Sequence, residues 1–164
     1  MLAALLIAQV FAVGIPPALP PPPTPEAIRA ARALYPTNPL DPQNSWGISI
    51  AAAQVAGDAL RARGLTTRER DTLLSDRLRD RAREAEAEII DAAIACIADP
   101  LATRLSAHDL RALGAFIATP EGANYWRITS HDNPGWQACF RAPVERHLAA
   151  SLEADVTAVV REAP

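Results

Sequence analysis

Residues 67–98 read TRERDTLLSDRLRDRAREAEAEIIDAAIACIA, and the spacing of their apolar positions decides the fold class. Small and apolar side chains recur there at intervals of three and four, at Leu74, Leu78, Ala82, Ala85, Ile89, Ala93 and Cys96. An α-helix turns once in about 3.6 residues, so these positions share one helical face. The stretch therefore predicts one long amphipathic helix from about Thr67 to Ala98.

The charges between these apolar positions are of both signs. One interpretation is a charged docking surface. The other is a solvated helix face stabilised by pairs such as Arg77–Asp80 and Arg81–Glu84, each contributing a few tenths of a kcal/mol. We favour the solvated face.

Composition extends the helical prediction to the whole chain of 164 residues, which is long enough for one domain with a core. Hydrophobic residues make up 49%, much of it alanine, and aromatic residues only 5%. Alanine favours helices, whereas strands favour β-branched and aromatic residues. All 16 basic residues are arginine, as a GC-rich genome would give, and they alternate with acids in a chain of net charge −3. That pattern argues against nucleic-acid or anionic-lipid partners.

Capping signals divide the chain before residue 65. Thr24-Pro25-Glu26 is typical of a helix start, and this helix should end at Tyr35-Pro36. Residues 36–47 contain Asn-Pro and Asp-Pro pairs and are predicted to be a loop. A second helix is expected over 47–63, ending at Gly64.

Two further starts follow Ala98: Ser106 caps one helix, and Thr119-Pro120-Glu121 opens the next. The final helix should begin near Pro134, with a kink or break at Pro143. Its apolar stripe comprises Trp136, Phe140, Val144, Leu148, Leu152, Val156 and Val159. The fold class is therefore all-α, a compact bundle of five or six helices over residues 25–164.

The first 24 residues have a different character. Residues 2–15, LAALLIAQVFAVGI, form an apolar run too short to span a bilayer as a helix, and small residues suited to cleavage follow. We interpret 1–18 as a signal peptide, although the usual positive charge after Met1 is missing. A buried helix is the alternative. The proline-rich residues 19–24 are predicted to be a stiff linker, or else a ligand for a proline-reading groove. The mature chain would be periplasmic or secreted by a bacterium, and would not span the membrane.

A motif follows the Ser106 cap, in LSAHDLRALGAFIATPEGANYW at residues 105–126. Here Leu113 and Phe116 should face the core, while Thr119 caps the next helix and Pro120 is its first residue. Gly122 should allow two helices to approach closely. The stretch thus makes sense as a tight helix–helix corner.

This motif resembles the bacterial domain-of-unknown-function family 2059. The matching positions are Ser106, Leu110, Leu113, Phe116, Thr119, Pro120 and Gly122. The family's usual Tyr after Phe is replaced by Ile117, and a vaguer similarity extends over about residues 65–150. The resemblance implies export and an all-α fold, and it implies no activity.

The two cysteines, Cys96 and Cys139, are predicted to form a disulfide if the chain is exported, and buried reduced thiols are the alternative. The three histidines, at 108, 131 and 147, are scattered, and no spacing suggests a metal or cofactor site. Ser130-His131 lacks the nucleophile elbow of hydrolases.

The last candidates are aromatic. Tyr125, Trp126 and Trp136 lie close in sequence and could form a contact patch, or could be core and loop anchors. We therefore expect a non-catalytic binding module of the bacterial envelope, with a protein or a small apolar molecule as partner. A hydrolase with an unrecognised site and a structural envelope component are the alternatives.

Overall fold

The computed structural model describes residues 21–163 except 36, 38–40 and 132–133, and this part of the chain is all-α. It contains eight helices and no strand: α1 (Pro25–Arg32), α2 (Pro42–Arg61), α3 (Arg68–Arg83), α4 (Glu86–Ala102), α5 (Ala107–Ile117), α6 (Pro120–His131), α7 (Pro134–Leu148) and α8 (Leu152–Glu162). The predicted fold class is confirmed, and the predicted count of five or six helices is wrong.

One source of the difference is the stretch 67–98, which forms two helices rather than one. Helix α3 ends at Arg83, and α4 begins at Glu86 after a turn at Glu84 and Ala85. No glycine or proline marks this turn. Its cause is tertiary packing, because α3 lies against α2 and α8 while α4 lies against α1 and α7.

The last predicted helix is also divided, although not at the proline. Pro143 lies inside α7, and the chain breaks instead at residues 149–151, before α8. A proline inside a helix costs about 3 kcal/mol, yet α7 continues through Pro143 to Leu148. Another boundary differs near Asp41-Pro42, where we expected a loop. The Asp41 side chain accepts a hydrogen bond from the backbone N–H of Gln43 at 2.9 Å, so α2 starts at Pro42.

The other local signals behave as predicted. Thr24 caps α1, and Ser106 caps α5 in a capping box that Asp109 completes. Gly64 adopts a positive φ of 66° after α2. The N–H of Leu65 donates to the carbonyl of Leu60 at 3.0 Å, closing the end of that helix.

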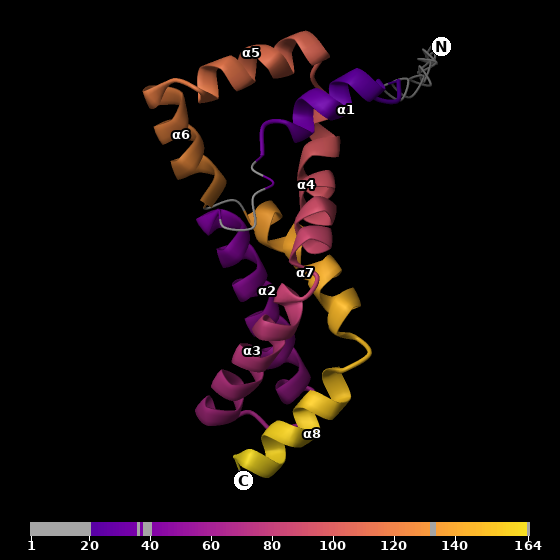
Figure 1. Ribbon diagram of the computed structural model, residues 1–164, viewed down its shortest axis with the longest axis vertical. Helices are drawn as coiled ribbons and strands as arrows, with labels where there is room; N and C mark the ends of the chain where they lie inside the picture. Colours follow the sequence, from indigo (N-terminus) through magenta and orange to yellow (C-terminus); the bar gives the residue numbers. More distant parts are fainter. Residues whose placement is uncertain (1–20, 36, 38–40, 132–133, 164) are drawn as a thin grey trace, which may run out of the picture.

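The helices form an elongated bundle rather than a compact one (Figure 1). Helices α2, α3 and α8 lie toward one end, α1, α5 and α6 toward the other, and α4 and α7 connect them. The core extends through both parts, and its largest fully buried side chains include Phe140, Ile48, Leu60, Leu74, Leu78, Ile90 and Leu110. No described helix is both long and apolar enough to cross a bilayer. The predicted signal peptide and residues 19–20 of the linker lie outside the described residues.

Candidate functional site

The α5–α6 corner has the geometry predicted for its glycine. The Thr119 Oγ1 accepts a hydrogen bond from the N–H of Gly122 at 3.1 Å. A Cβ atom on Gly122 would lie 1.9 Å from the carbonyl oxygen of Phe116, so only glycine fits this approach. Leu113 is half-buried against the core, whereas Phe116 is 45% exposed. The prediction that Phe116 faces the core is therefore wrong, and its ring lies beside Tyr125 of α6 instead.

The three candidate aromatic residues separate into two groups. Trp126 and Trp136 both contact Tyr35, with ring centroids 5.5 and 5.7 Å away. Tyr125 is 60% exposed and lies instead beside Phe116, with ring centroids 6.3 Å apart. The structure therefore does not bring the three into one patch.

Tyr35 is the residue that sequence reasoning missed. It is buried at the end of the α1 segment, and burial raises the pKa of its hydroxyl to about 12. It precedes Pro36, and no local pattern in the sequence predicts that it is buried. Trp136 is only 4% exposed and continues the cluster to Phe140, at a centroid distance of 5.4 Å. Trp126, by contrast, is half-buried.

A pocket of about 420 Å³ lies beside Trp126. It forms where the end of α1, the start of α2, the end of α5 and the middle of α6 meet. Apolar and polar side chains line it: Leu34, Pro42, Ile117, Ala123 and Trp126, with Asp41, Gln43 and Arg127. This volume lies in the usual range for small-molecule sites, and a mainly apolar lining with a few polar groups is typical of them.

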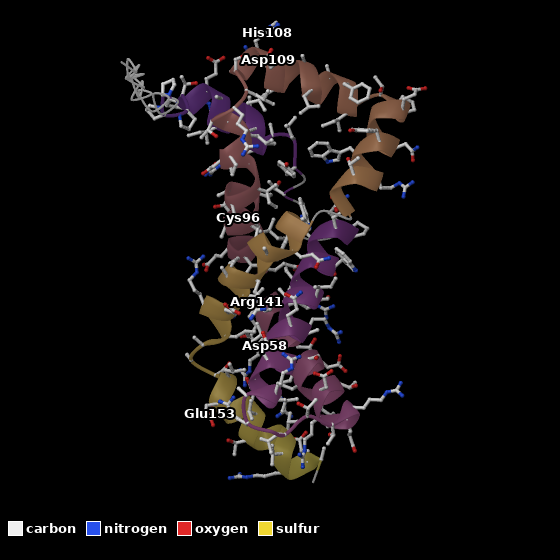
Figure 2. All side chains as sticks on the ribbon, turned by 180° about the vertical axis from the view of Figure 1, so that it is seen from behind. Asp58, Cys96, His108, Asp109, Arg141 and Glu153 are labelled. Carbon is white, nitrogen blue, oxygen red and sulfur yellow. A yellow bond between two sulfur atoms is a disulfide. The ribbon has the colours of Figure 1, made fainter. Side chains whose placement is uncertain are left out.

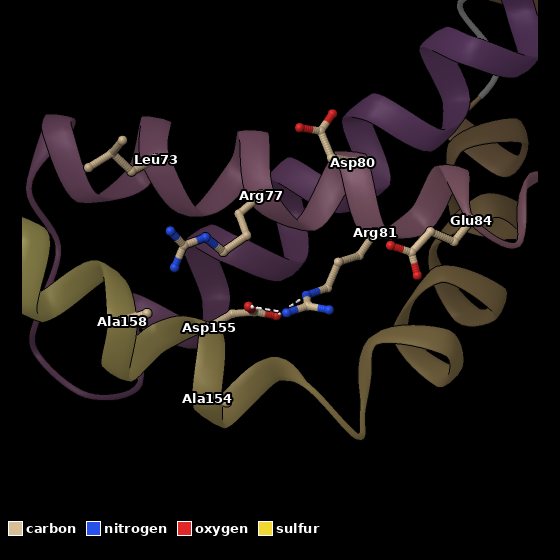
Figure 3. A pocket seen from close by; sticks show the side chains of 8 residues that line it. All are labelled: Leu73, Arg77, Asp80, Arg81, Glu84, Ala154, Asp155 and Ala158. Atoms are coloured by element: carbon tan, nitrogen blue, oxygen red, sulfur yellow. Dashed lines mark hydrogen bonds and ion pairs between the residues drawn. The ribbon is translucent and has the colours of Figure 1, made fainter.

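A larger groove of about 650 Å³ lies between α3 and α8 (Figure 3). Its centre is an ion pair in which Arg81 Nε and Asp155 Oδ2 are 2.7 Å apart, and Arg81 Nη2 donates to Oδ1 at 2.9 Å. The Asp155 side chain is only 4% exposed, and this carboxylate raises the pKa of Arg81 further. The other arginine of the groove, Arg77, donates to Glu162 at 2.9 and 3.1 Å.

These contacts correct the expected ion pairs of the charged stretch. Arg77 and Arg81 do not bond the acids three residues ahead but reach α8. The i,i+3 pairs that do form join Arg79 to Asp76 and Arg83 to Asp80. Part of the charged face of α3 thus packs against α8 of the same chain, while Arg79 and Arg83 form the local pairs expected of a solvated helix face.

A third hollow, of about 300 Å³, contains a second charge network. Arg141 on α7 and Asp58 on α2 lie close together (Figure 2), and Arg141 donates to Asp58 at 2.6 Å and to Glu145 at 2.6 Å. Arg61 donates to the same Asp58 carboxylate at 2.5 Å. The two guanidinium groups hold the pKa of Asp58 below its ordinary value, and that of Arg141 has the larger effect.

Cys96 and Cys139 form the predicted disulfide, which joins α4 to α7 with their Cα atoms 5.6 Å apart. Of the histidines, His108 is exposed at the start of α5, and the His147 Nε2 lies 3.1 Å from the carbonyl oxygen of Arg81. The side chain of His131 lies outside the described residues. Within the described part of the chain, no three His, Cys, Asp or Glu side chains are grouped to hold a metal ion.

Comparison of the chain with known protein families, characterised proteins and solved structures finds no match.

Proposed function

We propose that this chain is an exported, non-catalytic binding module of the bacterial envelope, and that it holds a small apolar ligand in the pocket beside Trp126. The observation that carries the proposal is the lining of that pocket: five apolar side chains from the α1 segment, α2, α5 and α6, with polar groups at Asp41, Gln43 and Arg127. Burial of apolar ligand surface supplies affinity, and a few polar groups orient the ligand.

The aromatic cluster supports this site because it fixes one wall. Trp126 contacts the buried ring of Tyr35 and also lines the pocket, so this contact holds the indole in place at the pocket wall. A wall that is already ordered loses little conformational entropy on binding. The two polar hollows give no comparable support for the hydrolase alternative, because their arginines are engaged by carboxylates.

Export is supported by two features. Residues 2–15 form the apolar run of a signal peptide, and the Cys96–Cys139 disulfide is of the kind that persists in oxidising compartments. The resemblance of residues 105–126 to family 2059 agrees with export, and membership of that family is part of the proposal.

The test is binding of the neutral apolar dye N-phenyl-1-naphthylamine to the mature chain. Ala123→Phe fills the pocket from α6 without removing an aromatic residue of the cluster, and it should weaken dye binding at least about tenfold, as lost apolar burial predicts. Ala112→Phe on the exposed side of α5 is the matched control and should bind as the unmodified chain does. Trp126→Ala should also abolish binding while the helical circular dichroism is retained.

Two results would overturn the ligand proposal. One is the absence of saturable binding of the dye to the unmodified chain. The other is equal affinity in the Ala123→Phe and Ala112→Phe variants. Capture of a protein partner that Ala123→Phe blocks, without dye binding, would assign the pocket to a protein instead.

A further inference from the structure

Three of the arginines of α3 lie beside its buried residues and share one stripe. Arg70, Arg77 and Arg81 are separated by seven and four residues, which places them on one face of the helix. All three reach α8 or the residue that follows it: Arg81 pairs with Asp155, Arg77 with Glu162, and Arg70 Nε donates to the Ala163 carbonyl at 2.6 Å. This set is called the arginine stripe below.

A fourth arginine extends the contact beyond α3. Arg63, in the turn after α2, forms an ion pair with Glu153 in the first turn of α8. The acids of α8 therefore meet guanidinium groups along the whole length of the helix. Arg70 adds a further favourable contact at the Ala163 carbonyl, because a cation near the last carbonyls of a helix interacts favourably with the helix dipole.

Apolar burial adds to these ion pairs. Val156 and Val159 of α8 are 2% and 0% exposed, and they belong to the same core cluster as Leu74 and Leu78 of α3. The partner of the arginine stripe is thus an amphipathic helix with valines on one side and carboxylates beside them.

Helix α8 also depends mainly on this one neighbour. Its extensive contacts are with α3, and the three small residues Ala149, Ala150 and Ser151 separate it from α7. The groove of about 650 Å³ between α3 and α8 shows that part of the contact is made by long side chains crossing open space (Figure 3). Release of α8 would break its contacts with the arginines and expose Val156 and Val159, so that a released helix needs another acceptor surface.

We propose that α8 is a detachable arm, and that the arginine stripe is an acceptor surface for an acidic amphipathic helix that a second copy of this chain can supply. Exchange of α8 between two copies would preserve every contact described above, since each stripe would receive the same helix from its neighbour. The turn at 149–151 would act as the hinge. This inference is independent of the pocket beside Trp126, which lies on other helices.

The first test adds a fluorescent peptide of residues 151–163, SLEADVTAVVREA, to the full chain and measures its anisotropy. Asp155→Asn in the chain weakens docking of its own arm and frees the stripe, so the peptide should bind at least about fivefold more tightly than to the unmodified chain. Adding Arg81→Ala to this variant should remove that gain. Raising the salt concentration should also weaken the peptide complex.

Asp80→Asn is the matched control, since Asp80 lines the same groove but pairs with Arg83. It should bind the peptide no better than the unmodified chain does. Peptide affinity that is the same with and without Arg81→Ala overturns the acceptor surface, as does the absence of binding to the Asp155→Asn chain.

The second test identifies the occupant by light scattering of a chain that lacks Ala149 and Ala150, because a shortened hinge hinders docking of the chain's own arm and leaves docking of a neighbour's arm unchanged. A dimer should form as the concentration rises, and an excess of the peptide should return it to a monomer, because peptide and exchanged arm compete for one stripe. A chain that remains monomeric at every concentration, or a dimer that the peptide does not dissociate, overturns the exchange of α8.

Discussion

Gly122 and Phe116 approach so closely that a Cβ atom on Gly122 would lie 1.9 Å from the Phe116 carbonyl oxygen and 2.5 Å from its carbonyl carbon. Both atoms belong to the backbone, so no side-chain rotation can relieve the clash. The first turn of α6 can lie against the last turn of α5 only because residue 122 has no side chain. The same corner places Trp126 beside the pocket.

Gly122→Ala should therefore lower the free energy of unfolding by at least about 2 kcal/mol, because the corner must open to admit the methyl group. Urea denaturation followed by circular dichroism measures the change. Gly57→Ala is the control: its Cβ would meet no atom nearer than 3.7 Å, and alanine inside α2 should stabilise by about 0.5–1 kcal/mol. Equal stabilities of the two variants would contradict this account of the corner.

Gly47 is required for a different reason, the packing of a side chain. A Cβ on Gly47 of α2 would lie 2.7 Å from the ring of Phe140 on α7. Gly47→Ala should cost about 1–3 kcal/mol through overpacking. Phe140→Leu removes part of the ring. The double variant should therefore lose less free energy of unfolding than the two single variants lose together. Strict additivity in a double-mutant cycle would show that the two positions are not coupled.

Local signals in the sequence were sufficient for much of the fold. The caps at Thr24 and Ser106 and the turn at Gly64 depend on residues within a few positions of each other, and the structure confirms all three. The division of residues 67–98 could not be predicted in this way. The turn at Glu84 and Ala85 consists of good helix formers, and it exists because the two halves pack on different neighbours.

The candidate sites were less predictable, since their partners are distant in sequence. Helical spacing predicts an ion pair between Arg81 and Glu84, whereas in the folded chain Arg81 pairs with the buried Asp155. Trp126 was identified as a candidate, but its partner Tyr35 carries no local signal of burial. The pairing of charges and the contacts between aromatic rings depend on which helices pack against each other.

The disulfide should make a large contribution to stability. Cys96 and Cys139 are 43 residues apart, and closing a loop of that length should stabilise by about 4 kcal/mol on the chain-entropy model. Exported protein should show no free thiols until a reductant is added, and then two. Replacing both cysteines by serine should lower the unfolding free energy by up to that amount. Two free thiols without reductant would contradict the pairing.

The Asp58 network predicts a pH dependence whose sign follows from its arginines. Arg141 and Arg61 lower the pKa of Asp58 from its ordinary 3.8 in the folded chain, so folding disfavours protonation. The stabilisation from this carboxylate is therefore present above about pH 3.8 and is lost as the pH falls through the lowered pKa.

A carboxyl titration by NMR measures this pKa directly. Arg141→Gln should raise the pKa of Asp58 toward its ordinary value, because the first of its two hydrogen-bonding cations is gone. Arg146→Gln, further along α7, should leave that pKa unchanged. An Asp58 pKa that is equal in the Arg141→Gln and unmodified chains would show that the ion pair does not persist in solution.

Export can be tested through the amino terminus of the secreted protein. If residues 1–18 act as a signal peptide, amino-terminal sequencing of material outside the cytoplasm should begin near Ile15 or Leu19, after small residues suited to cleavage. Leu6→Arg, which interrupts the apolar run, should retain the chain in the cytoplasm with Met1 intact. The retained chain should also keep Cys96 and Cys139 reduced, because the cytoplasm opposes disulfide formation. An unmodified chain found in the cytoplasm with Met1 intact would refute export, and the stability expected from the disulfide would then be absent from the protein in the cell.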